Sequence, residues 1–101
     1  MKRTEVKEIL DSYAVCQMQA LVLAKDKGAV SDELQSRLQK FELIKQFLDI
    51  LPFEDNALIR AVYIEKKPVT RLAKERGFAR SSIYKRLEKA VSLIAESIPF
   101  S

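Results

Sequence analysis

A chain of 101 residues, 48% hydrophobic and 32% charged with a net charge of +4, has the composition of an ordinary globular protein with one small core. It lacks histidine, the commonest general base and metal ligand, and its one cysteine, Cys16, can form neither an internal disulfide nor a zinc site. The acidic residues form no evident facing pair, so we expect no enzyme: no catalytic residue, no metal site and no cofactor.

The first expected helix covers residues 4–27, where apolar or tolerant residues recur at steps of three and four. From Tyr13 to Ala24 it is apolar around much of its circumference, so it needs cover on more than one side. Cys16 is expected to be a small buried side chain in this stretch. Gly28 is expected to end the helix in the left-handed conformation.

Ser31 is expected to cap a second helix, in which apolar residues recur at helical spacing as far as Leu51. Asp32 and Glu33 place negative charge at the positive end of its dipole. Because only a few residues join the two helices, residues 1–51 are expected to form an antiparallel helical hairpin.

Three more helices are expected over residues 52–101. Pro52 opens the first, and the sequence EKKP ends it, because the residue before a proline is pushed out of the helical region. The next helix is short and stops at Gly77, which permits the positive backbone angle of a tight turn, and a longer helix follows. The residues expected to be buried in these helices are Leu58, Ile59, Val62, Tyr63, Val69, Leu72, Ala73, Ile83, Leu87, Ala90, Val91 and Ile94. We therefore predict an all-α fold, with an N-terminal antiparallel helical hairpin followed by a three-helix helix-turn-helix domain.

Positive charge is concentrated in one segment of the second half. Residues 1–51 hold eight basic and eight acidic residues, whereas residues 66–89 hold nine basic and two acidic ones. A basic stripe this local usually faces a polyanion, either nucleic acid or an anionic membrane. We favour double-stranded DNA, because the apolar residues of these helices are needed for the core and leave no bulky face for a membrane.

The segment ILPFEDNALIRAVYIEKKPVTRLAKERGFARSSIYKRLEKAVSLI resembles the C-terminal DNA-binding domain of bacterial RNA polymerase sigma factors, and the short sigma-like regulators of phages and prophages. The shared features are Leu51-Pro52 at the start of a helix, Tyr63-Ile64-Glu65 near its end, Leu72-Ala73 and Gly77 in the next, and RSSIYKRLEKA as the recognition helix. The resemblance implies a helix-turn-helix that recognises promoter DNA.

Four positions depart from the family pattern. Pro68 and Arg71 stand where the family often has a serine and an acid that cap the second helix of the motif reciprocally. Ala79 replaces the serine or threonine that caps the recognition helix. Arg76 replaces an apolar residue before the turn, and we expect its stem to lie on the core with its charge in solvent.

In a helix-turn-helix, the first turn of the recognition helix enters the major groove. The residues that we expect to reach base edges are Arg80, Ser81, Ser82, Tyr84 and Lys85. The residues that we expect to contact phosphates are Thr70, Arg71 and Lys74 on the preceding helix and Arg86 and Lys89 on the recognition helix.

The resemblance predicts a phage or prophage transcriptional regulator that binds double-stranded DNA. One alternative is a small phage DNA-packaging protein similar to a terminase small subunit; another is a sigma-like module that binds protein, with RNA polymerase as the partner. We also predict a homodimer through the hairpin, whose excess apolar surface needs a partner, against a hairpin folded wholly onto its own domain. Since no apolar run is long enough to cross a bilayer and no signal peptide precedes the first helix, we expect a cytoplasmic protein without a membrane partner.

Overall fold

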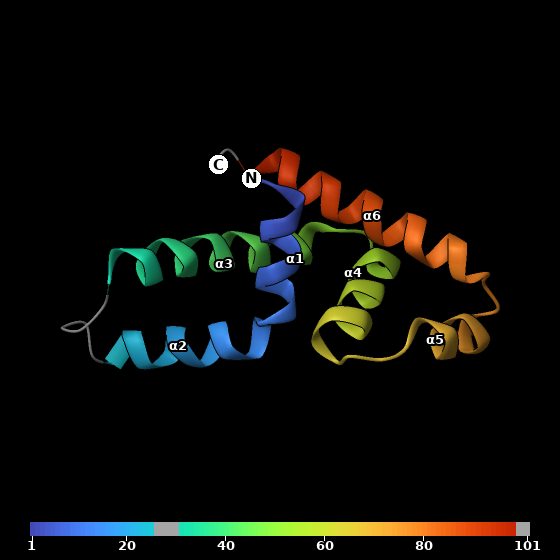
Figure 1. Ribbon diagram of the computed structural model, residues 1–101, viewed down its shortest axis with the longest axis horizontal. Coiled ribbons are helices and arrows are strands. Elements are labelled where there is room, and N and C mark those ends of the chain that lie inside the picture. The colour runs from blue at the N-terminus through green and yellow to red at the C-terminus, as the bar shows by residue number, and fades with distance from the viewer. Residues whose placement is uncertain (26–30, 99–101) are drawn as a thin grey trace.

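The computed structural model describes residues 1–25 and 31–98, and every regular element among them is a helix (Figure 1). The elements are α1 (Arg3–Asp11), α2 (Tyr13–Lys25), α3 (Asp32–Ile50), α4 (Phe53–Ile59), a π-helical turn η1 (Arg60–Ile64), α5 (Val69–Arg76) and α6 (Arg80–Ser97). The predicted all-α class is confirmed for this part of the chain. Gly28, the expected end of the first helix, lies outside the described residues.

The single helix predicted over residues 4–27 is wrong, because two helices meet at Ser12. The Ser12 hydroxyl donates a hydrogen bond to the Glu8 carbonyl at 2.8 Å and accepts one from the Arg37 guanidinium at 2.8 Å. A serine hydroxyl that bonds a carbonyl of the preceding turn competes with the backbone ladder and bends a helix. As a result, α1 leaves the direction of α2 and crosses the middle of the molecule (Figure 1).

α2 and α3 lie side by side (Figure 1), and α3 begins where its sequence predicts. The Ser31 hydroxyl accepts a hydrogen bond from the Leu34 N–H at 3.2 Å, so the predicted cap of α3 is confirmed. Tyr13 of α2 meets Phe41 of α3 edge to face, with ring centroids 5.0 Å apart. Cys16 is fully buried, as predicted.

α1 packs against α6, although the two helices lie at opposite ends of the chain (Figure 1). Val6, Ile9 and Leu10 of α1 are buried in the same hydrophobic cluster as the inner face of α6. The boundary expected between residues 51 and 52 falls between α3 and α4, but the segments on both sides contribute to this one core.

The core of the second half follows the predicted pattern. Eight of the predicted residues are buried, namely Leu58, Ile59, Leu72, Ile83, Leu87, Ala90, Val91 and Ile94. The other four, Val62, Tyr63, Val69 and Ala73, are partly buried against them. The helical period of apolar residues was therefore sufficient to orient these helices relative to the core.

The helix that begins after Pro52 ends in a π-helical turn. The Glu65 N–H donates to the Arg60 carbonyl at 2.8 Å, which widens the last turn by one residue. Lys66 then has a positive φ of 59°, and its ammonium group lies 3.0 Å from the Asp11 carboxylate at the end of α1. The predicted break at EKKP is thus confirmed, and the ion pair between Lys66 and Asp11 holds this segment against α1.

The molecule is elongated, with extents of 49 × 24 × 20 Å. Figure 1 shows the α2 and α3 pair at one end and α5 with the start of α6 at the other. Within the described residues, no helix combines the length and apolar character needed to span a membrane.

Candidate nucleic-acid interface

Gly77 forms the corner between α5 and α6. It has a φ of 69°, and its N–H donates to the Ala73 carbonyl, as expected of a left-handed helix end. A Cβ at this position would meet no atom within 4 Å, so glycine is favoured here by the backbone angle and not by lack of space. Leu72 on α5 and Ile83 on α6 are buried, and Phe78 packs partly buried against the same core. These side chains set the direction in which α6 leaves the corner.

The first turn of α6 lies on the surface. All five predicted base-reading residues, Arg80, Ser81, Ser82, Tyr84 and Lys85, are exposed. Ile83, in their midst, is fully buried and anchors the turn. Ser81, Lys85 and Lys89 follow one another at intervals of four residues, which places them along one side of the helix. This side presents one hydroxyl and two ammonium groups as hydrogen-bond donors.

The first turns of α5 and α6 have no side-chain cap among the described residues. Pro68 and Ala79 occupy the capping positions, as the departures from the family pattern led us to expect. Uncapped N–H groups at the start of a helix are positive and can bind an anion.

Three of the predicted phosphate contacts, Thr70, Arg71 and Lys74, are exposed on α5, and Lys89 is exposed on α6. Arg71 forms an ion pair with Glu75 one turn along, at 3.0 Å. Both side chains of this pair are largely exposed, so the pair contributes little stability. The Arg71 guanidinium can therefore exchange Glu75 for another anion. Arg76 is half-buried before the turn, which fits a stem lying on the core.

Arg86 is engaged within the protein. Its guanidinium lies 3.0 Å from the Glu54 carboxylate, 3.9 Å from that of Asp55, and 5.5 Å from the centre of the Phe78 ring. It therefore links α6 to the first turn of α4 and to the corner after Gly77. The sequence pattern gave no sign of this cluster, because Glu54 is 32 residues away. A phosphate contact by Arg86 stays a prediction, and it would compete with two carboxylates.

Six of the nine basic residues between 66 and 89 have no carboxylate within ion-pair distance in the described part of the chain. They are Lys67, Lys74, Arg76, Arg80, Lys85 and Lys89. The two acids of the same segment, Glu75 and Glu88, are both ion-paired, with Arg71 and with Lys7. Among the described residues, therefore, few acids compensate the positive charge of this segment.

The two shortest ion pairs of α1 connect it to α6 and to α3, and sequence reasoning missed both of them. Lys7 lies 2.7 Å from Glu88 on α6, and Lys40 on α3 lies 2.9 Å from Glu5. The hydrogen bond from Lys7 lowers the pKa of Glu88 below its ordinary value, and the same bond raises the pKa of Lys7. The bond from Lys40 likewise lowers the pKa of Glu5. These pairs join residues far apart in the chain, so no local pattern could have revealed them.

We expect acid to loosen the contacts of α1. Because the pKa values of Glu5 and Glu88 are lowered in the folded protein, the unfolded chain binds more protons below pH 4.5, the ordinary value of both groups. Their contribution is present above that pH and is lost as the pH falls through the lowered values. The free energy of unfolding, measured in urea between neutral pH and about pH 3, should fall in this window. Glu88→Gln should make the fall shallower, and an unchanged pH dependence in this variant would contradict the assignment.

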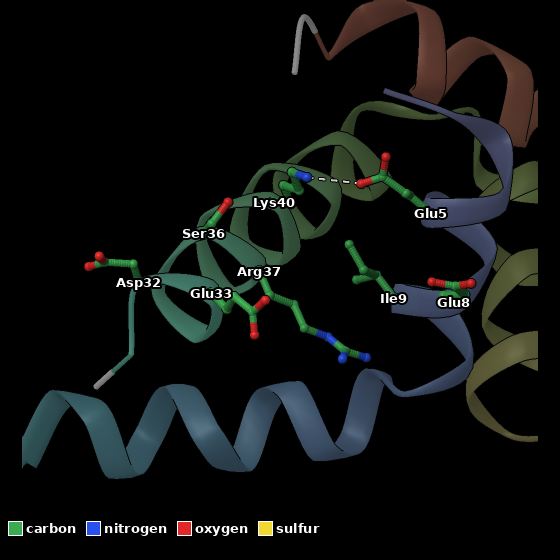
Figure 2. A pocket seen from close by; sticks show the side chains of 8 residues that line it. All are labelled: Glu5, Glu8, Ile9, Asp32, Glu33, Ser36, Arg37 and Lys40. Atoms are coloured by element: carbon green, nitrogen blue, oxygen red, sulfur yellow. Dashed lines mark hydrogen bonds and ion pairs between the residues drawn. The ribbon is translucent and has the colours of Figure 1, made fainter. Parts of the chain in front are cut away.

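A hollow of about 470 Å³ lies between α1 and α3 (Figure 2). Four acidic side chains line it, Glu5, Glu8, Asp32 and Glu33, together with Arg37 and Lys40. Figure 2 shows Lys40 reaching from α3 to Glu5 on α1. The excess of acids disfavours nucleic acid here, and the described residues include no group of acidic or cysteine side chains that could hold a metal ion.

The chain matches no protein-family model, no curated protein and no solved structure. Its function is therefore inferred from the geometry and charge of α5 and α6, together with the resemblance described above.

Proposed function

We propose that the protein binds double-stranded DNA sequence-specifically, with α4, α5 and α6 acting as a helix-turn-helix. The observation that supports this most directly is the coincidence of two features on one segment. Six basic side chains without an ion-pair partner among the described residues lie on the same 24-residue stretch as the Gly77 corner and the exposed first turn of α6. α2 and α3 lie at the other end of the molecule, so they leave this turn accessible (Figure 1).

Each group of residues has a distinct role in this proposal. The first turn of α6 enters the major groove, where Arg80 and Lys85 donate to guanine and Ser81 and Ser82 bond to neighbouring base edges. Tyr84, which exposes 54% of its surface, lies beside them. The phosphate contacts come from Thr70, Arg71 and Lys74 on α5 and from Lys89 and Arg86 on α6, and Arg86 exchanges its two carboxylates for a phosphate.

The biological role that we propose is regulation of transcription by a phage or prophage protein similar to the promoter-recognising domain of sigma factors. Selection of bound sites from random duplexes tests it, and enrichment of one motif is the expected result. No enrichment at low salt would refute DNA recognition and favour a protein-binding module, for which RNA polymerase is the first candidate partner. Weak enrichment together with rings of many subunits would instead favour a DNA-packaging role.

The salt dependence of binding should report how many phosphates are contacted. Neutralising about six phosphates predicts a slope of about −5 for log affinity against log salt concentration. Lys89→Ala should weaken binding to all duplexes alike and flatten this slope by about one unit. Fluorescence anisotropy with a labelled duplex at several salt concentrations measures both quantities. Lys45→Ala on α3 provides the control, and an equal change in both variants would argue against a phosphate contact by Lys89.

A further inference from the structure

α2 has a second apolar face that no described element covers. Val15, Met18, Leu21 and Val22 expose 55, 66, 63 and 67% of their surface. Their neighbours on the other side of the helix, among them Tyr13 and Cys16, are buried in the core. Residues 13–24 include no charged residue, so no charge on this helix segment opposes its removal from water.

The exposed side of α3 is different in character. Apart from Ile50 at its end, which exposes 76% of its surface, its exposed residues are polar or charged, among them Gln35, Gln39, Glu42, Gln46 and Asp49. Figure 1 shows α3 along one side of α2 and no other described element along the opposite side. The uncovered apolar surface of this pair of helices therefore belongs mainly to α2.

We infer that two copies of the chain pair antiparallel through this face of α2, with the twofold axis next to Met18. In a twofold contact, residue i of one copy meets residue j of the other, and j meets i. The exposed apolar positions have this symmetry, because Val15 and Leu21 are each three residues from Met18, and Ala14 and Val22 are each four residues from it. Every apolar side chain of one copy then meets an apolar side chain of the other.

The area of this face indicates a weak dimer. Burying an aliphatic side chain of this size removes on the order of 100 Å² from water. Four side chains that are about two-thirds exposed therefore offer roughly 500–600 Å² for the pair, below the ~1,200 Å² of a lasting interface. α2 and the first turn of α6 lie at opposite ends of the molecule, so pairing leaves both turns uncovered (Figure 1). Binding of this dimer to two half-sites of one duplex rests on the proposed DNA binding. A duplex that holds two copies close together would raise their effective concentration and so strengthen the contact between them.

Sedimentation equilibrium of the full chain, with four variants, tests the inference. The unmodified protein should self-associate between about 10 and 300 μM. Val15→Glu and Leu21→Lys should each weaken the association at least about tenfold, because each takes a charge into an apolar contact. The double variant should return to within about threefold of the unmodified protein, because position 15 of one copy faces position 21 of the other and the new charges are opposite. Gln39→Lys, on the polar side of α3, is the matched control and should change nothing.

Two results would overturn the inference. One is a monomer throughout the concentration range, and the other is a double variant that associates no better than the two single variants. Binding to a duplex with one half-site separates this proposal from the proposed function. A protein that dimerises as described but binds no duplex leaves the dimer standing and refutes DNA recognition, whereas a protein that binds one half-site but never dimerises refutes only the α2 contact.

Discussion

Replacing Leu10 by alanine is expected to lower the free energy of unfolding by about 2–5 kcal/mol. Leu10 is fully buried on α1, in the cluster that includes the inner face of α6. The truncation removes apolar contacts and leaves a cavity that the surrounding helices fill only in part. Since small domains are stable by only about 5–15 kcal/mol, this is a large fraction of the total. Urea unfolding followed by circular dichroism measures it.

The same change at Leu21 is the matched control. Leu21 belongs to the same stretch that the sequence predicted as one helix, but it exposes 63% of its surface. Leu21→Ala should therefore change the free energy of unfolding by no more than about 0.5 kcal/mol. Equal losses in the two variants would contradict the break at Ser12 and the packing of α1 on α6. Measurements at low protein concentration keep any dimer from affecting the comparison.

Arg80→Ala is expected to change which DNA sequence the protein prefers. A bidentate contact from an arginine to guanine discriminates against the wrong base by about 1–3 kcal/mol, or roughly 5- to 150-fold. Arg80 is exposed on the first turn of α6 and has no ion-pair partner among the described residues, so its loss should leave the fold intact. Site selection repeated with the variant should show one base position that is no longer specified.

Lys74→Ala on α5 separates reading of bases from general attraction to phosphates. It removes one positive charge, as Arg80→Ala does, and its side chain is also exposed. We expect Lys74→Ala to weaken binding to all sequences by a similar factor and to leave the preferred motif unchanged. If the two variants share one motif with the unmodified protein, Arg80 does not read a base.

The parts of the fold that could be predicted from the sequence depend on neighbouring residues in the chain. The cap at Ser31 requires a hydroxyl three residues before the Leu34 N–H, and the corner at Gly77 requires a residue that tolerates a positive φ. The buried faces of α5 and α6 follow from the spacing of apolar residues along one helix. The exposure of the candidate base-reading residues follows from the same spacing, since they flank the buried Ile83 and precede the buried Leu87.

The features that could not be predicted depend on partners far away in the chain. The Ser12 hydroxyl accepts a hydrogen bond from Arg37, 25 residues later. The apolar residues keep their helical spacing from α1 into α2, so the sequence pattern does not show the bend between them. Arg86 looked like any other exposed cation, but residues of α4 hold it. Lys7 and Glu88 are separated by 81 residues. Contacts between residues so far apart in the sequence form when helices pack, and a local sequence pattern contains no information about them.

By itself, the sequence determined that this chain is helical, which face of each helix in its second half is buried, and that its basic residues gather on the last two helices. Only the tertiary structure decided that α1 turns away from α2 to support α6, which basic residues are neutralised by acids, and which face of α2 is left uncovered. The physical reason is that helix formation and periodic burial depend on residues within one or two turns, whereas the choice of partner depends on which surfaces meet after the chain has folded.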